Sequence, residues 1–269
     1  GGVYVLELSS YQIDLCHALD CDIAVLLNIT PDHLDRYDGF ADYAAAKERL
    51  FTMQHVDKVA VIATEDDRTK MIASRINHRL MRVSSKQVGD QSRWPSLQGP
   101  HNAQNVAAAR AVAEVLGIKA STIEEALHTY PGLPHRMERV RELGGVLYVN
   151  DSKATNPTST APALAAYPAI HWILGGRAKT EDLDACEPHF SHVRAAYTIG
   201  ESAGMFASLL KGSMPVSECG SLGVAVRAAS KAAVAGETVL LSPACASFDQ
   251  FTDFEARGDA FRAAVEALA

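Results

Sequence analysis

Short apolar runs alternate with helix-forming stretches along the whole chain, and this alternation constrains the fold more than any other feature. In the first half, apolar runs predict strands near residues 3–8, 22–29, 58–64 and 79–84, followed by helices near 102–116 and 121–129. In the second half, they predict strands near 146–150, 171–175, 195–199 and 237–242, and a last helix near 257–268. This order is typical of mostly parallel sheets covered by helices.

A break in the pattern divides the chain. The segment YPGLPHRMERV, with two prolines and a glycine, follows the helix that ends near Tyr130. We therefore expect a hinge near 131–136 and an α/β fold of two doubly wound units, residues 1–132 and 133–269. A chain of 269 residues with 48% apolar composition is long enough to build two cores.

Charge and cysteine usage exclude several classes of protein. The net charge is −7 and no run of Lys or Arg occurs, which argues against a nucleic-acid partner. The five cysteines form no CxxC pair and no Cys/His metal spacing, which favours a reducing cytoplasm. No apolar run approaches the roughly 20 residues of a membrane span. We therefore expect a cytoplasmic protein that acts on small molecules.

The stretch DGFADYAAAKERLF, residues 38–51, is an amphipathic helix with Lys47 in its apolar face. Such a lysine usually extends its amine to solvent. If it is buried instead, its pKa falls, and the neutral amine can take up carbon dioxide as a carbamate, which is an oxygen ligand for Mg²⁺. Glu7 in ELSSYQ and His33 in TPDHLDRY could join it. A charge at a sheet end and a Thr-Pro-Asp turn explain these two residues as well.

The segment GPHNAQN opens a helix with Asn102 and Asn105 three positions apart, so both amides share one face. Each amide offers a donor and an acceptor, which suits the edge of an adenine. Helix capping by one asparagine and solvation of the other is an equally good explanation.

The segment NDSKATN follows a predicted strand of the second half and places Asp151, Lys153, Thr155 and Asn156 before a helix. In open α/β sheets, ligands bind at the carboxyl ends of the strands. A lysine beside hydroxyl and amide donors at a helix start is suited to an anion. A simple N-cap accounts for the hydroxyl groups but not for the lysine.

Two further turns follow predicted strands. In LGGRAK, Gly175 and Gly176 permit a tight turn before Lys179. In LLSPACASFDQF, Ser247 and Gln250 have the spacing of a capping box, which predicts a helix start whose free N–H groups could hold a carboxylate.

Over its whole length the chain resembles the Mur ligase family. Eight motifs occur in the family's order: ELSSYQ, TPDHLDRY, AAKERL, GPHNAQN, GLPHRME, NDSKATN, LGGRAK and LLSPACASFDQF. The resemblance implies a partial central ATPase-like domain over 1–132 and a C-terminal Rossmann-like domain over 133–269 that binds amino acid and nucleotide.

The resemblance also implies a reaction. A Mur ligase forms an amide bond with hydrolysis of ATP, with Mg²⁺, during peptidoglycan synthesis for the cell wall. The carboxylate of UDP-MurNAc-L-alanine is phosphorylated, and the amine of the amino acid then displaces phosphate. DSKATN and SPACASFDQF favour D-glutamate as that amino acid. We expect a monomer.

The resemblance assigns roles by motif. The Mg²⁺ ligands are Glu7, His33 and carbamylated Lys47. The catalytic residues are Lys47, His33 and Lys153. The contacts near the muramoyl substrate are Ser9, Gln12 and His33. The nucleotide contacts are Asn102, Asn105, Arg136 and Asp151, the last on the ribose. The D-glutamate contacts are Lys153, Thr155, Lys179, Ser247 and Phe254.

The family also carries an N-terminal UDP-binding domain and a phosphate loop of the form GxxxxGK[ST]. No such motif occurs in this sequence. We therefore expect that residues 1–269 alone do not complete the reaction. The alternatives are another Mur-type amide ligase such as folylpolyglutamate synthase, and a non-catalytic nucleotide or metabolite-binding module.

Overall fold

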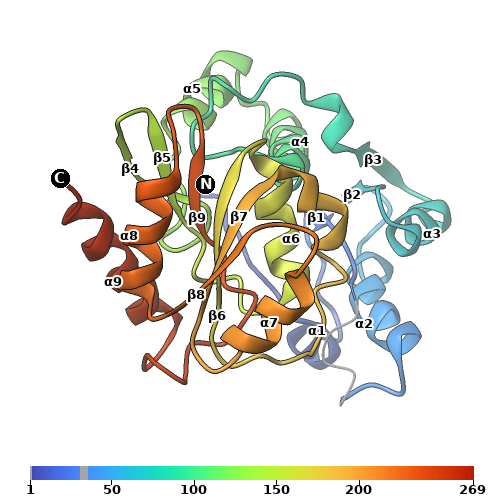
Figure 1. Cartoon of the computed structure of the whole chain (residues 1–269). Coiled ribbons are helices and arrows are strands. Elements are labelled where there is room, and N and C mark those ends of the chain that lie inside the picture. The colour runs from blue at the N-terminus through green and yellow to red at the C-terminus, as the bar shows by residue number, and fades with distance from the viewer. Residues whose placement is uncertain (1, 31–35) are drawn as a thin grey trace. The chain divides into compact units, whose positions relative to one another are not determined.

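The computed structural model describes residues 2–30 and 36–269, which form two compact units (Figure 1). The first unit comprises residues 1–93 and 101–128, and the second comprises residues 94–100 and 129–269. Each unit has its own sheet.

The sheet of the first unit is parallel, in the order β1 (Ile23–Leu26), β2 (Val59–Ala63) and β3 (Arg79–Val83). Every residue of β2 is buried, as expected for a central parallel strand covered on both faces. Ala60 and Ile62 face α2 (Phe40–Thr52) and α3 (Asp67–Arg75). Val61 faces the opposite way, toward α4 (Pro100–Val115). The remaining helices are α1 (Ser10–Leu15), α5 (Ala120–Thr129) and the short 3-10 helix η1 (Ser85–Gln87).

The second unit contains a six-stranded sheet in the order β4-β5-β9-β6-β7-β8, in which only β4 is antiparallel. The strands are β4 (Glu138–Leu143), β5 (Val146–Asn150), β6 (Ile170–Gly175), β7 (Val193–Ile199), β8 (Val216–Gly220) and β9 (Thr238–Leu241). The helices are α6 (Pro157–Ala166), η2 (Glu187–His192), α7 (Ala203–Leu210), α8 (Leu222–Ala232) and α9 (Phe254–Glu266).

Helices cover both faces of the second sheet. Trp172 and Leu174 of β6 pack with α6 and α7 in one core. Ile173, between them, packs with α8 and α9 in the other, and Figure 1 shows these two helices side by side. This alternation confirms the predicted doubly wound α/β fold.

One predicted strand is wrong. Residues 2–9 form no strand, and the side chains of Val3, Tyr4, Val5 and Leu6 are exposed. An extended segment needs a neighbouring strand to pair its N–H and C=O groups, and β1 pairs with β2 alone among the described strands. Two edge strands, β4 and β8, were not predicted, because many of their side chains are polar and at least partly exposed, so they form no apolar run.

Candidate active site

Asp151 lies directly after β5 and is buried. Its Oδ2 accepts a hydrogen bond from Ser242 Oγ at 2.7 Å, and its Oδ1 accepts one from the backbone N–H of Met137 at 3.2 Å. Burial raises the pKa of this carboxyl group to about 7, against the opposing effect of these bonds and of Arg136. Arg136 itself is exposed. Asp151 can therefore exchange a proton near neutral pH.

Lys153 and Phe254 meet at the same edge of the sheet. The Lys153 Nζ lies 3.8 Å from the centroid of the Phe254 ring, close enough for a cation–π interaction. Both side chains are half-buried. Nearby in sequence, Thr155 Oγ1 accepts a hydrogen bond from the exposed Lys179 Nζ at 3.5 Å. Four predicted D-glutamate contacts thus form two pairs: Lys153 contacts Phe254, and Lys179 contacts Thr155.

Ser247 is buried in the turn that follows β9, but no helix begins there. Its backbone carbonyl accepts bonds from Gln250 N at 3.1 Å and Phe251 N at 2.8 Å. Helix α9 begins at Phe254 and is capped by Asp253, whose Oδ1 accepts a bond from Ala256 N at 2.6 Å. The predicted capping box of Ser247 is therefore wrong, because the charged carboxylate of Asp253 caps the helix farther on.

The turn after β6 depends on its glycines, as predicted. Gly175 and Gly176 have φ angles of 125° and 133°, which L side chains rarely adopt. A Cβ on Gly175 would overlap the carbonyl oxygen of Ile199, and one on Gly176 would overlap that of Ala246. Because these two positions have no side chain, the backbone atoms at the ends of β6 and β7 and in the loop after β9 can lie in direct contact.

Arg257 was not predicted. This residue of α9 is 1% exposed and donates from Nε to Ser152 Oγ at 3.0 Å and from Nη2 to Ser152 O at 2.9 Å. Burial lowers the pKa of its guanidinium to about 10. It fixes the backbone between Asp151 and Lys153 to the start of α9. An arginine in an amphipathic helix gives no sequence signal for such a role, because it usually lies in solvent.

The predicted Mg²⁺ ligands are only partly described. Glu7 is exposed in the irregular segment before α1, and Lys47 is half-buried, with its Nζ 5.1 Å from the centroid of the Tyr43 ring. His33 lies outside the described residues. Within residues 2–30 and 36–269, no group of three His, Cys, Asp or Glu side chains is placed to hold a metal. The chemistry of the donor set suits Mg²⁺ if Lys47 becomes a carbamate, because Glu7 and a carbamate both offer oxygen ligands.

Ser9 and Gln12 form a capping box at the start of α1, which was not predicted. The Gln12 N–H donates to Ser9 Oγ at 3.3 Å, and the Ser9 N–H donates to Gln12 Oε1 at 2.8 Å. The signal was present, since S-x-x-Q is the motif's spacing.

Asn102 and Asn105 meet on one face of α4, where Asn105 Nδ2 donates to Asn102 Oδ1 at 3.3 Å. The shared face of the helix was predicted. The preceding His101 has a buried Nδ1 with no hydrogen-bond partner within the described part of the chain, and burial lowers its pKa to about 4.

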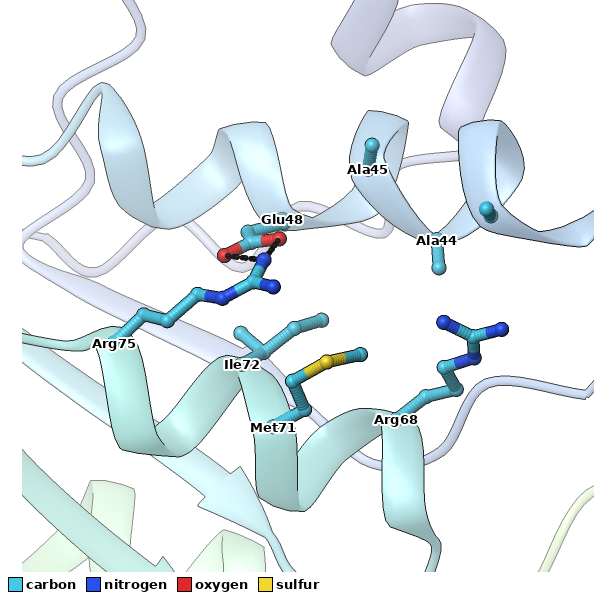
Figure 2. A pocket seen from close by; sticks show the side chains of 8 residues that line it. Ala44, Ala45, Glu48, Arg68, Met71, Ile72 and Arg75 are labelled. Carbon is cyan, nitrogen blue, oxygen red and sulfur yellow. Dashed lines mark hydrogen bonds and ion pairs between the residues drawn. The ribbon is translucent and has the colours of Figure 1, made fainter.

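A shallow pocket lies between α2 and α3 (Figure 2). Arg75 binds Glu48 across its rim at 3.0 Å, and Arg68 points toward Ala44 of α2. None of the predicted site residues lines this pocket.

The family of the chain follows from this fold and from sequence comparison. The model of the Mur ligase middle domain matches residues 2–96, and that of the Mur ligase glutamate ligase domain matches residues 135–245. The chain belongs to the Mur ligase family.

Particular relatives are similar over nearly all of the chain. A protein of Sphingopyxis alaskensis named UDP-N-acetylmuramoylalanine--D-glutamate ligase is 60% identical, over 99% of this chain and 63% of its own length. One of the same name from Novosphingobium aromaticivorans is 59% identical, over 100% of this chain and 62% of its own length. The chain therefore spans less than two thirds of these relatives.

Solved structures share the fold. The crystal structure of the MurF ligase from Thermotoga maritima in complex with ADP has a TM-score of 0.70 at 16% identity, and the match covers 97% of this chain and 66% of that one.

Among residues 2–30 and 36–269, no helix is both long enough and apolar enough to cross a membrane.

Proposed function

We propose that this chain is part of an ATP-dependent ligase that adds D-glutamate to UDP-MurNAc-L-alanine during peptidoglycan synthesis. The identity of 58–60% with three relatives named UDP-N-acetylmuramoylalanine--D-glutamate ligase, over 99–100% of the chain, carries the proposal. In this proposal, residues 1–132 form the central ATP-binding domain and residues 133–269 the domain for amino acid and nucleotide. The protein works as a cytoplasmic monomer.

The second unit receives D-glutamate. Its two carboxylates need cationic and N–H donors, and its amine must stay free to attack. Lys153 and Lys179 supply the cations, while the hydroxyl groups of Thr155 and Ser247 supply further donors. The Phe254 ring lies against the Lys153 ammonium and limits its positions, which supports this assignment.

The nucleotide contacts are Asn102, Asn105, Arg136 and Asp151. Asp151 has both carboxylate oxygens bonded within the protein, so its position is fixed before a ribose hydroxyl binds. The proposed Mg²⁺ ligands remain Glu7, His33 and Lys47; the ion would neutralise charge around the transferring phosphoryl group. Ser9 and Gln12 contact the muramoyl substrate.

The proposal is tested with the enzyme encoded by the full gene. Phosphate release is measured with UDP-MurNAc-L-alanine and ATP, with D-glutamate, L-glutamate or no amino acid added. We expect turnover when D-glutamate is added, and none with L-glutamate or without an amino acid. Turnover with L-glutamate and a folate acceptor would show a folylpolyglutamate synthase instead.

The 269-residue chain is tested separately. We expect no ligase product from it, and calorimetric binding of D-glutamate. A product that requires ATP and D-glutamate would contradict the expectation that the chain alone is inactive. Binding of D-glutamate without turnover in the enzyme encoded by the full gene would support a non-catalytic binding module.

A further inference from the structure

Three tyrosines form a row of ring contacts from helix α1 to helix α2, one pair stacked and the other tilted, and we call this row the stack. Tyr11 of α1 stacks on Tyr37, with centroids 6.3 Å apart and planes at 20°, and Tyr37 contacts Tyr43 of α2 at 5.5 Å and 57°. A cation lies at each end of the stack. The Arg36 guanidinium is 4.3 Å from the Tyr11 centroid, and the Lys47 Nζ is 5.1 Å from the Tyr43 centroid.

Tyr37 is also anchored through its hydroxyl group. It donates to Asp14 Oδ2 of α1 at 2.8 Å. The other oxygen of Asp14 is 3.6 Å from Arg49 Nη1 of α2, and Arg49 donates to the carbonyls of Asp14 and Cys16, at 3.3 Å and 2.8 Å. Arg49 thus satisfies carbonyl groups at the end of α1. It also holds in place the Asp14 carboxylate, which accepts the hydrogen bond from Tyr37.

We propose that Tyr37 is a positioning residue for Lys47: it keeps the Tyr43 ring, and with it the Lys47 amine, in a fixed relation to α1. The importance of this role rests on the proposed function, in which Lys47 of α2 and Gln12 of α1 serve one reaction.

The chemistry of the stack supports the assignment. A lysine side chain has four rotatable bonds and loses much rotamer freedom when it is fixed in one place. In the unmodified lysine, before any carbamate forms, the negative face of the Tyr43 ring attracts the ammonium and limits the positions that Nζ can take. That ring can direct Lys47 only while its own orientation is held, and Tyr37 is the aromatic neighbour that also has a fixed polar anchor.

A purely structural role would have a different signature. If Tyr37 only filled space between the helices, its removal would lower the stability of the first unit and leave the surroundings of Lys47 as they are. The test therefore observes Lys47 itself.

The experiment is NMR of the 269-residue chain labelled in its lysines, with Lys47 assigned through Lys47→Arg. The Tyr43 ring current displaces the Lys47 ε-methylene signals. We expect Tyr37→Leu to remove more than half of that displacement, and Tyr37→Phe, which keeps the ring and loses the bond to Asp14, to remove less. The exposed Tyr4→Leu is the matched control, and Lys70 of α3 is the internal reference.

Unchanged Lys47 signals in a folded Tyr37→Leu variant would overturn the proposal, and so would equal changes at Lys47 and Lys70. If Tyr37→Leu does not fold, Tyr37→Phe decides: a reduced Lys47 displacement supports the proposal and an unchanged one overturns it. No readout uses ligase turnover, so a failure here leaves the proposed function intact, and the turnover assay can fail without affecting this result.

Discussion

The ammonium group of Lys153 lies against the ring of Phe254, 3.8 Å from its centroid, although the two residues are far apart in sequence. One residue follows β5 and the other begins α9. The contact therefore links the lysine that is suited to bind a carboxylate to the first residue of helix α9.

We expect Phe254→Leu to weaken D-glutamate binding about fivefold, because a partly buried cation–π contact contributes about 1 kcal/mol. Calorimetry with D-glutamate measures the change. Phe190→Leu, in η2 beside Trp172, is the control for the loss of a ring elsewhere in the unit. Equal affinities of Phe254→Leu and the parent chain would contradict the expectation.

Asp151 makes stability depend on pH. Its folded pKa, about 7, exceeds its usual value of 3.8, so the folded state holds a proton that the unfolded state releases between these values. Stability from this group is therefore greatest below pH 4, falls as the pH rises through about 7, and changes no further above that. The fall is at most about 4 kcal/mol, from 1.36 kcal/mol per pKa unit.

Urea unfolding at a series of pH values, compared between the parent and Asp151→Asn, isolates this contribution. The variant cannot ionise at this position, so the difference in unfolding free energy between the two should shift in favour of the variant as the pH rises from 4 to 8. A difference that stays constant across this range would show that Asp151 does not titrate as expected.

The glycine turn after β6 is expected to reject a methyl group. Gly176→Ala combines a φ of 133° with overlap on the carbonyl of Ala246, so we expect a loss of more than about 3 kcal/mol or failure to fold. Gly212, with φ of 93° and nothing within 4 Å of an added methyl group, isolates the backbone strain. Gly212→Ala should cost about 1 kcal/mol. Similar melting temperatures for the two variants would refute the role of close packing.

Arg257→Lys should destabilise the second unit by about 2 kcal/mol, because an ammonium group cannot make both fork contacts with Ser152 from this position. Arg227→Lys, at an exposed position of α8, is the matched substitution and should have little effect. The comparison is made by chemical denaturation. If both variants unfold at the same urea concentration, the buried bonds of Arg257 add nothing to stability.

Much of the architecture could be predicted because central parallel strands are nearly continuous apolar runs. Strand β5 begins and ends where the sequence indicated, and β2 differs by one residue at each end. The edge strands β4 and β8 lack that signal, since their side chains are largely in contact with water. Residues 3–8 have a strand's composition, but composition cannot supply a partner strand.

The positions of Asp151 and Lys153 at the carboxyl end of β5 were predictable, because both residues follow a clear strand in the sequence. It was not predictable where the role depends on distant packing. Arg257 acts on Ser152 from another element, and only the folded chain brings them together. The last helix was predicted from residue 257, but it begins three residues earlier, at Phe254, because Asp253 caps it there. The assignments to substrate and metal stay predictions.

The capping box of α1 has one more consequence. Within residues 2–30 and 36–269, the two hydrogen bonds that hold the Gln12 side chain both end on Oε1, from the N–H and the hydroxyl of Ser9. The amide nitrogen, on the other branch of the same planar group, is thereby aimed in one direction and left to donate. A ligand that takes this donor meets a side chain whose rotamer freedom was already lost when the helix formed, so the entropy of fixing a glutamine is a cost of folding and not of binding.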